Sequence, residues 1–144
     1  MDKKSFLQAG HTPTLLAAFL YFDLAFMVWV ILGPLGVGIA KDLGLSHAEK
    51  GMMVATPVLA GALLRIIMGI LVDRLSPKKA AIIGQVVVIA TMLYAWQIGV
   101  HSYGEVLVLG LFLGVAGASF AAALPLASRW YPAEHQGTAM GIAG

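Results

Sequence analysis

Four long apolar runs, separated by short polar connections, constrain this 144-residue chain more than any other feature. The runs span about residues 14–40, 51–72, 80–99 and 106–129, and each is long enough to cross the roughly 30 Å core of a bilayer as a helix. Of all residues, 60% are hydrophobic and 11% are charged, whereas about a quarter are charged in soluble proteins. We therefore predict an all-α membrane protein whose helices form one bundle.

The basic residues predict how the bundle is oriented. One side of the predicted bundle carries six basic residues, namely Lys3, Lys4, Arg74, Lys78, Lys79 and Arg129, whereas the opposite side carries only Lys41 and Lys50. Short loops rich in lysine and arginine stay in the cytoplasm. The bias predicts a multi-pass protein of the cytoplasmic membrane with its N-terminus in the cytoplasm.

A fifth apolar segment begins near Gly137, after Pro132. Its eight residues would span about 12 Å as a helix, which is too short to cross the membrane. We therefore expect residues 1–144 to be a truncated N-terminal bundle of a larger transporter or channel, which would be completed by a missing C-terminal half.

Arg65 is the lone charge in the second apolar run. An arginine inside a membrane costs several kcal/mol and cannot lose its proton, so an anion, a carboxylate or backbone carbonyls must compensate it. Helical rise places Arg65, Asp23 and Phe120 at comparable depths of about 12, 15 and 13 Å from the cytoplasmic side. We hypothesise that these three side chains converge from three helices.

Each of these residues has an alternative role. Arg65 could pair with Asp23 or bond to carbonyls without binding a ligand. Asp23 could carry a coupling proton or remain ionised in that pair, and Phe120 could simply pack against lipid or helices. Small residues near Arg65 and Phe120 could leave room for a small ligand or only allow helices to pack closely; they include Gly61, Gly69, Gly114 and Gly117.

The sequence argues against several other classes of protein. All four histidines fall in tails or loops, no lysine lies inside a span, and Asp23 is the lone acidic residue within the spans. A haem bundle, a retinal Schiff base and a divalent-cation site are therefore unsupported. There is no cysteine. The net charge is only +2 and the basic residues are scattered, which does not favour nucleic-acid binding. We predict no enzyme activity, metal or other cofactor, and an anion path instead.

The segment GILVDRLSPKKAAIIG, residues 69–84, resembles the signature between the second and third helices of the major facilitator superfamily. That signature is a glycine followed by an Asp-Arg pair and a basic run, here Gly69, Asp73, Arg74, Lys78 and Lys79. Ser76-Pro77 replaces a second glycine expected before the basic run. The resemblance implies that the Asp-Arg pair caps and tethers helix ends, which would latch one conformation.

Residues 116–144 resemble the nitrate/nitrite porter family of that superfamily, whose glycine-rich signature starts on the fifth helix. Residues 22–36 also look like the first helix of its bacterial members. The matching positions of the glycine-rich signature are Gly137, Ala139, Gly141 and Gly144.

This resemblance implies secondary active transport by alternating access between two six-helix repeats. It implies that Arg65 coordinates nitrate or nitrite, that Phe120 packs against the anion, and that the glycines of the fifth helix let helices slide. It leaves open symport or exchange. The alternatives are a transporter of another small or organic anion and a membrane scaffold held by an Arg65–Asp23 pair.

Overall fold

The computed structural model describes residues 6–144, which form eight helices. The short α1 (Phe6–Ala9) is followed by α2 (Thr12–Trp29) and α3 (Leu32–Asp42), which together make the first apolar span. The second and third spans are α4 (His47–Leu75) and α5 (Pro77–Ile98). The fourth is made of α6 (Tyr103–Ala118) and α7 (Phe120–Ser128), and α8 (Ala133–Ala143) follows it. Four spans long and apolar enough to cross a bilayer confirm the predicted all-α membrane fold.

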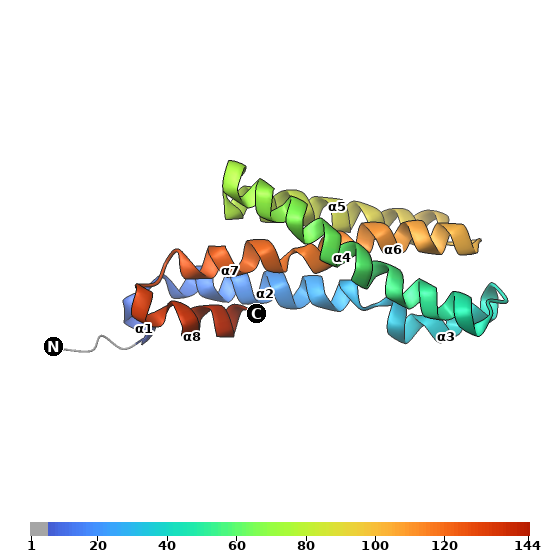
Figure 1. Cartoon of the computed structure of the whole chain (residues 1–144), viewed down its shortest axis with the longest axis horizontal. Helices are drawn as coiled ribbons and strands as arrows, with labels where there is room; N and C mark the ends of the chain where they lie inside the picture. Colours follow the sequence, from blue (N-terminus) through green and yellow to red (C-terminus); the bar gives the residue numbers. More distant parts are fainter. Residues whose placement is uncertain (1–5) are drawn as a thin grey trace.

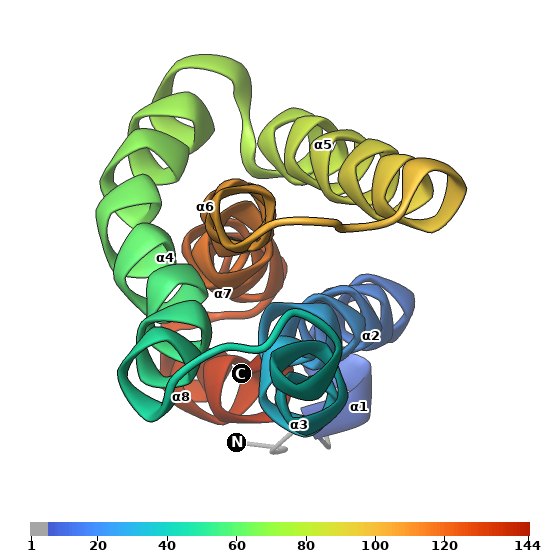
Figure 2. The same cartoon turned by 90° about the vertical axis from the view of Figure 1, so that its right-hand side faces the viewer.

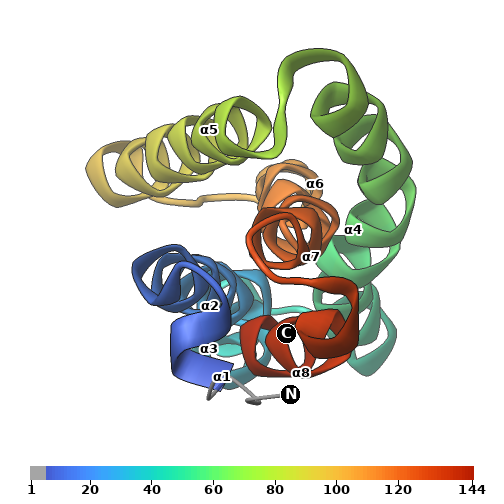
Figure 3. The same ribbon diagram turned by 90° about the vertical axis from the view of Figure 1, so that its left-hand side faces the viewer.

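The fourth span forms the centre of the bundle. Figures 2 and 3 show α6 and α7 surrounded by α2, α4 and α5, with α8 beside α2. In the most apolar part of the fourth span 56% of the residues are buried, against 22% or less in the other three spans. Figure 1 shows that α1, α8 and the end of α7 lie at one end of the bundle and α3 at the other. The fourth span is therefore the most buried of the four.

Two spans predicted as single helices are each broken once. In the first span, Pro34 has no N–H to donate to the carbonyl of Val30, which instead accepts a 2.9 Å hydrogen bond from the Gly33 N–H. The break therefore falls directly after Trp29. In the fourth span, Ser119 separates α6 from α7, and its N–H donates to the carbonyl of Ala116, three residues back, at 3.2 Å.

The turn between α4 and α5 is tighter than predicted, because both helices extend beyond the expected boundaries at residues 72 and 80. A single residue, Ser76, separates them, and its φ of +121° lies in a region that favours glycine. Its side chain accepts a hydrogen bond from the Lys79 N–H at 3.5 Å. The glycine that the family signature has before its basic run would relieve this backbone strain.

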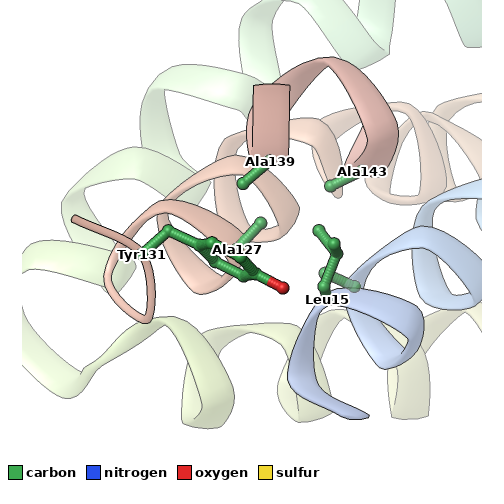
Figure 4. Close-up of a cluster of buried hydrophobic side chains, with 6 residues drawn as sticks. Leu15, Ala127, Tyr131, Ala139 and Ala143 are labelled. Atoms are coloured by element: carbon green, nitrogen blue, oxygen red, sulfur yellow. The ribbon is translucent and has the colours of Figure 1, made fainter. Parts of the chain in front are cut away.

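The fifth segment begins earlier than expected. α8 starts at Ala133 rather than near Gly137, because Pro132 takes the N-cap position, where an extended backbone precedes the helix. Buried side chains from α2, α7 and α8 meet here, and Figure 4 shows Leu15, Ala127, Tyr131, Ala139 and Ala143 pointing toward one another. Apolar packing therefore holds α8 against the first and fourth spans.

Candidate functional site

The Arg65 side chain reaches from α4 to the break in the fourth span. Its Nη2 donates a hydrogen bond to the carbonyl of Gly117 at 3.2 Å, and its Cζ lies 5.1 Å from the centre of the Phe120 ring. Gly117 is in the last turn of α6, where carbonyls lack N–H donors within the helix. A cation over a ring contributes about 0.5–2 kcal/mol. The break at Ser119 thus supplies both an acceptor and an aromatic ring to the guanidinium.

Two of the three guanidinium nitrogens of Arg65 make no hydrogen bond to residues 6–144. Arg65 is half-buried, and its Nε is buried without a hydrogen-bond partner among residues 6–144. Nη1 makes no hydrogen bond to these residues either, but it is not among the buried atoms. A planar guanidinium with an accessible terminal nitrogen can bind an oxyanion along that edge.

Asp23 does not pair with Arg65. Within residues 6–144, its carboxylate makes no ion pair shorter than 4.0 Å and no hydrogen bond, although it is half-buried on α2. Its neighbour Phe22 reaches the site instead, because its ring meets that of Phe120 edge-on, with centroids 5.4 Å apart. Of the alternatives for Arg65, the bond to a backbone carbonyl is the one that the structure contains. Proton carriage by Asp23 stays a prediction.

Three aromatic residues of α2 form a stripe that we did not identify from the sequence. The rings of Phe22 and Phe26 lie 6.0 Å apart, and those of Phe26 and Trp29 lie 5.8 Å apart. The Trp29 Nε1 donates to the carbonyl of Pro57 in α4 at 2.8 Å. Their spacing of four and three residues places them on one helical face, and this pattern was the signal that could have revealed them.

Three of the predicted glycines lie at close approaches between helices. A Cβ on Gly61 would lie 3.0 Å from the Trp29 ring, and one on Gly117 would overlap the same ring. A Cβ on Gly114 would lie 2.5 Å from the Cβ of Ala60. The backbones of α4 and α6 can therefore approach each other at Gly114, and the Trp29 ring of α2 can pack against Gly61 and Gly117, only because these positions lack side chains.

The other predicted glycines have more space. In the part of the chain that the structure describes, nothing lies within 4 Å of a Cβ placed on Gly69, Gly137 or Gly141. Gly144 lies close to the site, since a Cβ there would be 3.0 Å from the edge of the Phe120 ring. Gating by these four residues stays a prediction.

The charged residues of the motif between the second and third spans are all exposed. Asp73, Arg74, Lys78 and Lys79 lie in the helical turns on either side of Ser76, and among residues 6–144 their side chains make no hydrogen bond or ion pair. The cap at this turn comes from the hydroxyl of Ser76 rather than from Asp73. A tether by the Asp-Arg pair would therefore need a partner other than the side chains that these two residues contact among residues 6–144.

A cavity of about 820 Å³ lies between α5 and α6, and Arg65 does not line it. Its polar side chains include His101 and Glu105 near the loop joining these helices. Among residues 6–144, no group of three acidic, histidine or cysteine side chains could hold a metal ion. Arg65 itself is half-buried.

Known proteins support the resemblance seen in the sequence. Residues 15–144 match the Major Facilitator Superfamily. The chain is 38% identical over 139 residues to the "Probable nitrate/nitrite transporter NarK2" of Mycobacterium tuberculosis, which covers 94% of this chain and 34% of that protein. It is 34% identical over 126 residues to the "Probable nitrate/nitrite antiporter NarK1" of Thermus thermophilus, covering 87% of this chain and 28% of the relative.

A third relative, the "Nitrite extrusion protein" of Bacillus subtilis, is 32% identical over 119 residues, which cover 83% of this chain and 30% of the relative. The predicted similarity to nitrate/nitrite porters is confirmed by these names. The chain spans about a third of the length of the curated relatives it matches.

Proposed function

The chain belongs to the major facilitator superfamily, and from this we propose that it forms the N-terminal part of a nitrate or nitrite transporter in which Arg65 binds the anion. The observation that carries the proposal is a guanidinium within an apolar span, held by a carbonyl and a ring, with no ion pair to a carboxylate within 4.0 Å among residues 6–144. The positive charge is therefore not neutralised. Charges inside a membrane are usually functional, and an anion is the natural partner of this one.

Nitrate suits the geometry of this site. It is planar, and its oxygens can accept two parallel hydrogen bonds from the edge of a guanidinium. The Phe120 ring covers one side of the guanidinium, which limits access of water and strengthens the attraction between the charges. Arg65 engages Gly117 through Nη2, so a second positive group from a C-terminal half would complete the binding of the anion.

Alternating access would expose this site first to one side of the membrane and then to the other. In such transporters the substrate binds near the membrane midplane, between repeats that rock against each other. The open faces of Gly137 and Gly141 on α8 would let helices slide during this motion. The exposed Asp73 and Arg74 would tether the cytoplasmic face in one state. The protein would lie in the cytoplasmic membrane with its N-terminus in the cytoplasm.

Transport measurements test the proposal. The assay is nitrate uptake into proteoliposomes by the complete transporter, meaning a polypeptide that carries residues 1–144 together with a C-terminal half. Lysine keeps the charge of Arg65 but cannot form two parallel bonds. Loss of one charge-assisted bond of about 1.5–3 kcal/mol lowers affinity roughly 10- to 100-fold.

The matched control is Arg74→Lys, because Arg74 lies on the same helix but is exposed outside the site. We expect Arg65→Lys to lose most nitrate uptake at low concentration and Arg74→Lys to retain its anion affinity. Near wild-type uptake by Arg65→Lys would contradict the anion site and favour a scaffold role.

A further inference from the structure

We propose that Trp29 is a positioning residue for anion binding, which holds Arg65 in place through the backbone of Gly117. The inference rests on the proposed function of Arg65 and adds a residue that does not itself touch the guanidinium. Trp29 ends α2, directly before the break in the first span. Its indole connects three helices at the level of the site.

The indole of Trp29 occupies a slot between two glycines. Gly61 of α4 and Gly117 of α6 both lie against the ring, and a Cβ at Gly61 would lie 3.0 Å from Nε1. The Nε1 donates to the carbonyl of Pro57 at 2.8 Å, which fixes the rotation of the ring. Gly61 lies one turn before Arg65 on α4, so the indole packs against both the helix that carries the guanidinium and the helix that carries its acceptor.

Gly117 has contacts on two sides. Its Cα lies against the indole, where a methyl group would overlap the Trp29 ring, and its carbonyl accepts the hydrogen bond from Arg65. The Nη2···O distance of 3.2 Å is at the long end of the usual range. A shift of this backbone by a few tenths of an ångström would therefore weaken the bond.

The same indole is connected to the other partner of Arg65. Contacts between aromatic edges continue from Trp29 along one face of α2 to Phe22, whose ring packs against Phe120. Phe120 lies under the guanidinium. Trp29 is thus linked to both groups that hold Arg65. It contacts Gly117, whose carbonyl is the acceptor, and it is connected through Phe26 and Phe22 to the ring of Phe120.

Precise placement matters for an anion that binds by two parallel hydrogen bonds, since small displacements of a binding group cause large losses. Trp29→Leu removes the indole from the slot and lets α4 and α6 move relative to each other. We expect it to raise the nitrate dissociation constant at least fivefold. Gly117→Ala should raise it at least tenfold, because its methyl group pushes against the indole.

The experiment measures nitrate dissociation constants and thermal midpoints of the complete transporter with Trp29→Leu, Gly117→Ala and the double variant. The control is Trp96→Leu, which removes a tryptophan of α5 that is 79% exposed. The double variant has room for the methyl group. We expect it to bind nitrate more tightly than Gly117→Ala alone, while Trp96→Leu binds like the wild type.

Different results identify which claim fails. If the Trp29 and Gly117 variants lower the thermal midpoint but leave the nitrate dissociation constant unchanged, Trp29 is only structural and the inference is overturned, while loss of binding in Arg65→Lys still supports the proposed function. Additive losses in the double variant also overturn the inference, because the two residues then act independently. A wild-type transporter that binds no nitrate refutes both.

Discussion

The close contact between α4 and α6 at Gly114 predicts that alanine there lowers the stability of the chain, whereas alanine at a control glycine raises it slightly. Gly114→Ala would place a methyl carbon 2.5 Å from the Cβ of Ala60, 2.8 Å from the N of Gly61 and 2.9 Å from the carbonyl carbon of Ala60. Ordinary contacts begin at 3.4 Å, so the closest pair overlaps by 3.4 − 2.5 = 0.9 Å. Two of the three atoms belong to the backbone and cannot turn aside, so the two helices must separate.

The expected cost follows from that separation. Overpacking a well-packed interface costs about 1–3 kcal/mol, and this site lies at the upper end because the overlap is with backbone. Alanine recovers up to about 1 kcal/mol of helix propensity over glycine. The net destabilisation is therefore about 2 kcal/mol. For a chain of this size, that corresponds to a drop in the thermal midpoint of about 4–8 °C.

The assay is thermal unfolding of the 144-residue chain in detergent micelles, followed by tryptophan fluorescence. The control is Gly51→Ala, which is also on a membrane-spanning helix and has nothing within 4 Å of an added Cβ. It should raise the midpoint slightly, because only the propensity term applies. A Gly114→Ala midpoint at or above that of the wild type would show that α4 and α6 do not pack as described.

Two further predictions concern the turn and the carboxylate. Ser76→Gly should stabilise the chain by about 1 kcal/mol, because a φ of +121° is strained for serine but not for glycine; a lower thermal midpoint would contradict this. Asp23→Asn should leave nitrate binding intact but weaken proton-coupled accumulation, because asparagine cannot carry a proton. An unchanged dependence of uptake on external pH would argue against a proton role for Asp23.

The spans and the depth of the site were predictable from the sequence. Hydropathy and length identify membrane helices because the bilayer sets both, and the four predicted runs correspond to four spans. A constant rise per residue placed Arg65 and Phe120 at similar depths, and the structure brings them within 5.1 Å. The break in the first span was not predicted, although Pro34 is a signal for it, because proline removes a backbone donor.

The rotation of the helices was not predictable in the same way. Adjacent residues on a helix point about 100° apart, so a small rotation of α2 decides whether Asp23 or Phe22 faces Phe120, and the structure selects Phe22. The acceptor of Arg65 was missed as well, because it is a backbone carbonyl. The helix break at Ser119, next to this carbonyl, could not be predicted in the same way as the first break, because no proline follows it by one turn.

The most direct test of the account is the nitrate affinity of Arg65→Lys in the complete transporter, measured at equilibrium by isothermal titration calorimetry beside Arg74→Lys. The account predicts that Arg65→Lys raises the dissociation constant by at least about tenfold, equivalent to 1.4 kcal/mol, while Arg74→Lys leaves it unchanged. Equal nitrate affinities for both variants and the wild type would contradict a binding role for Arg65.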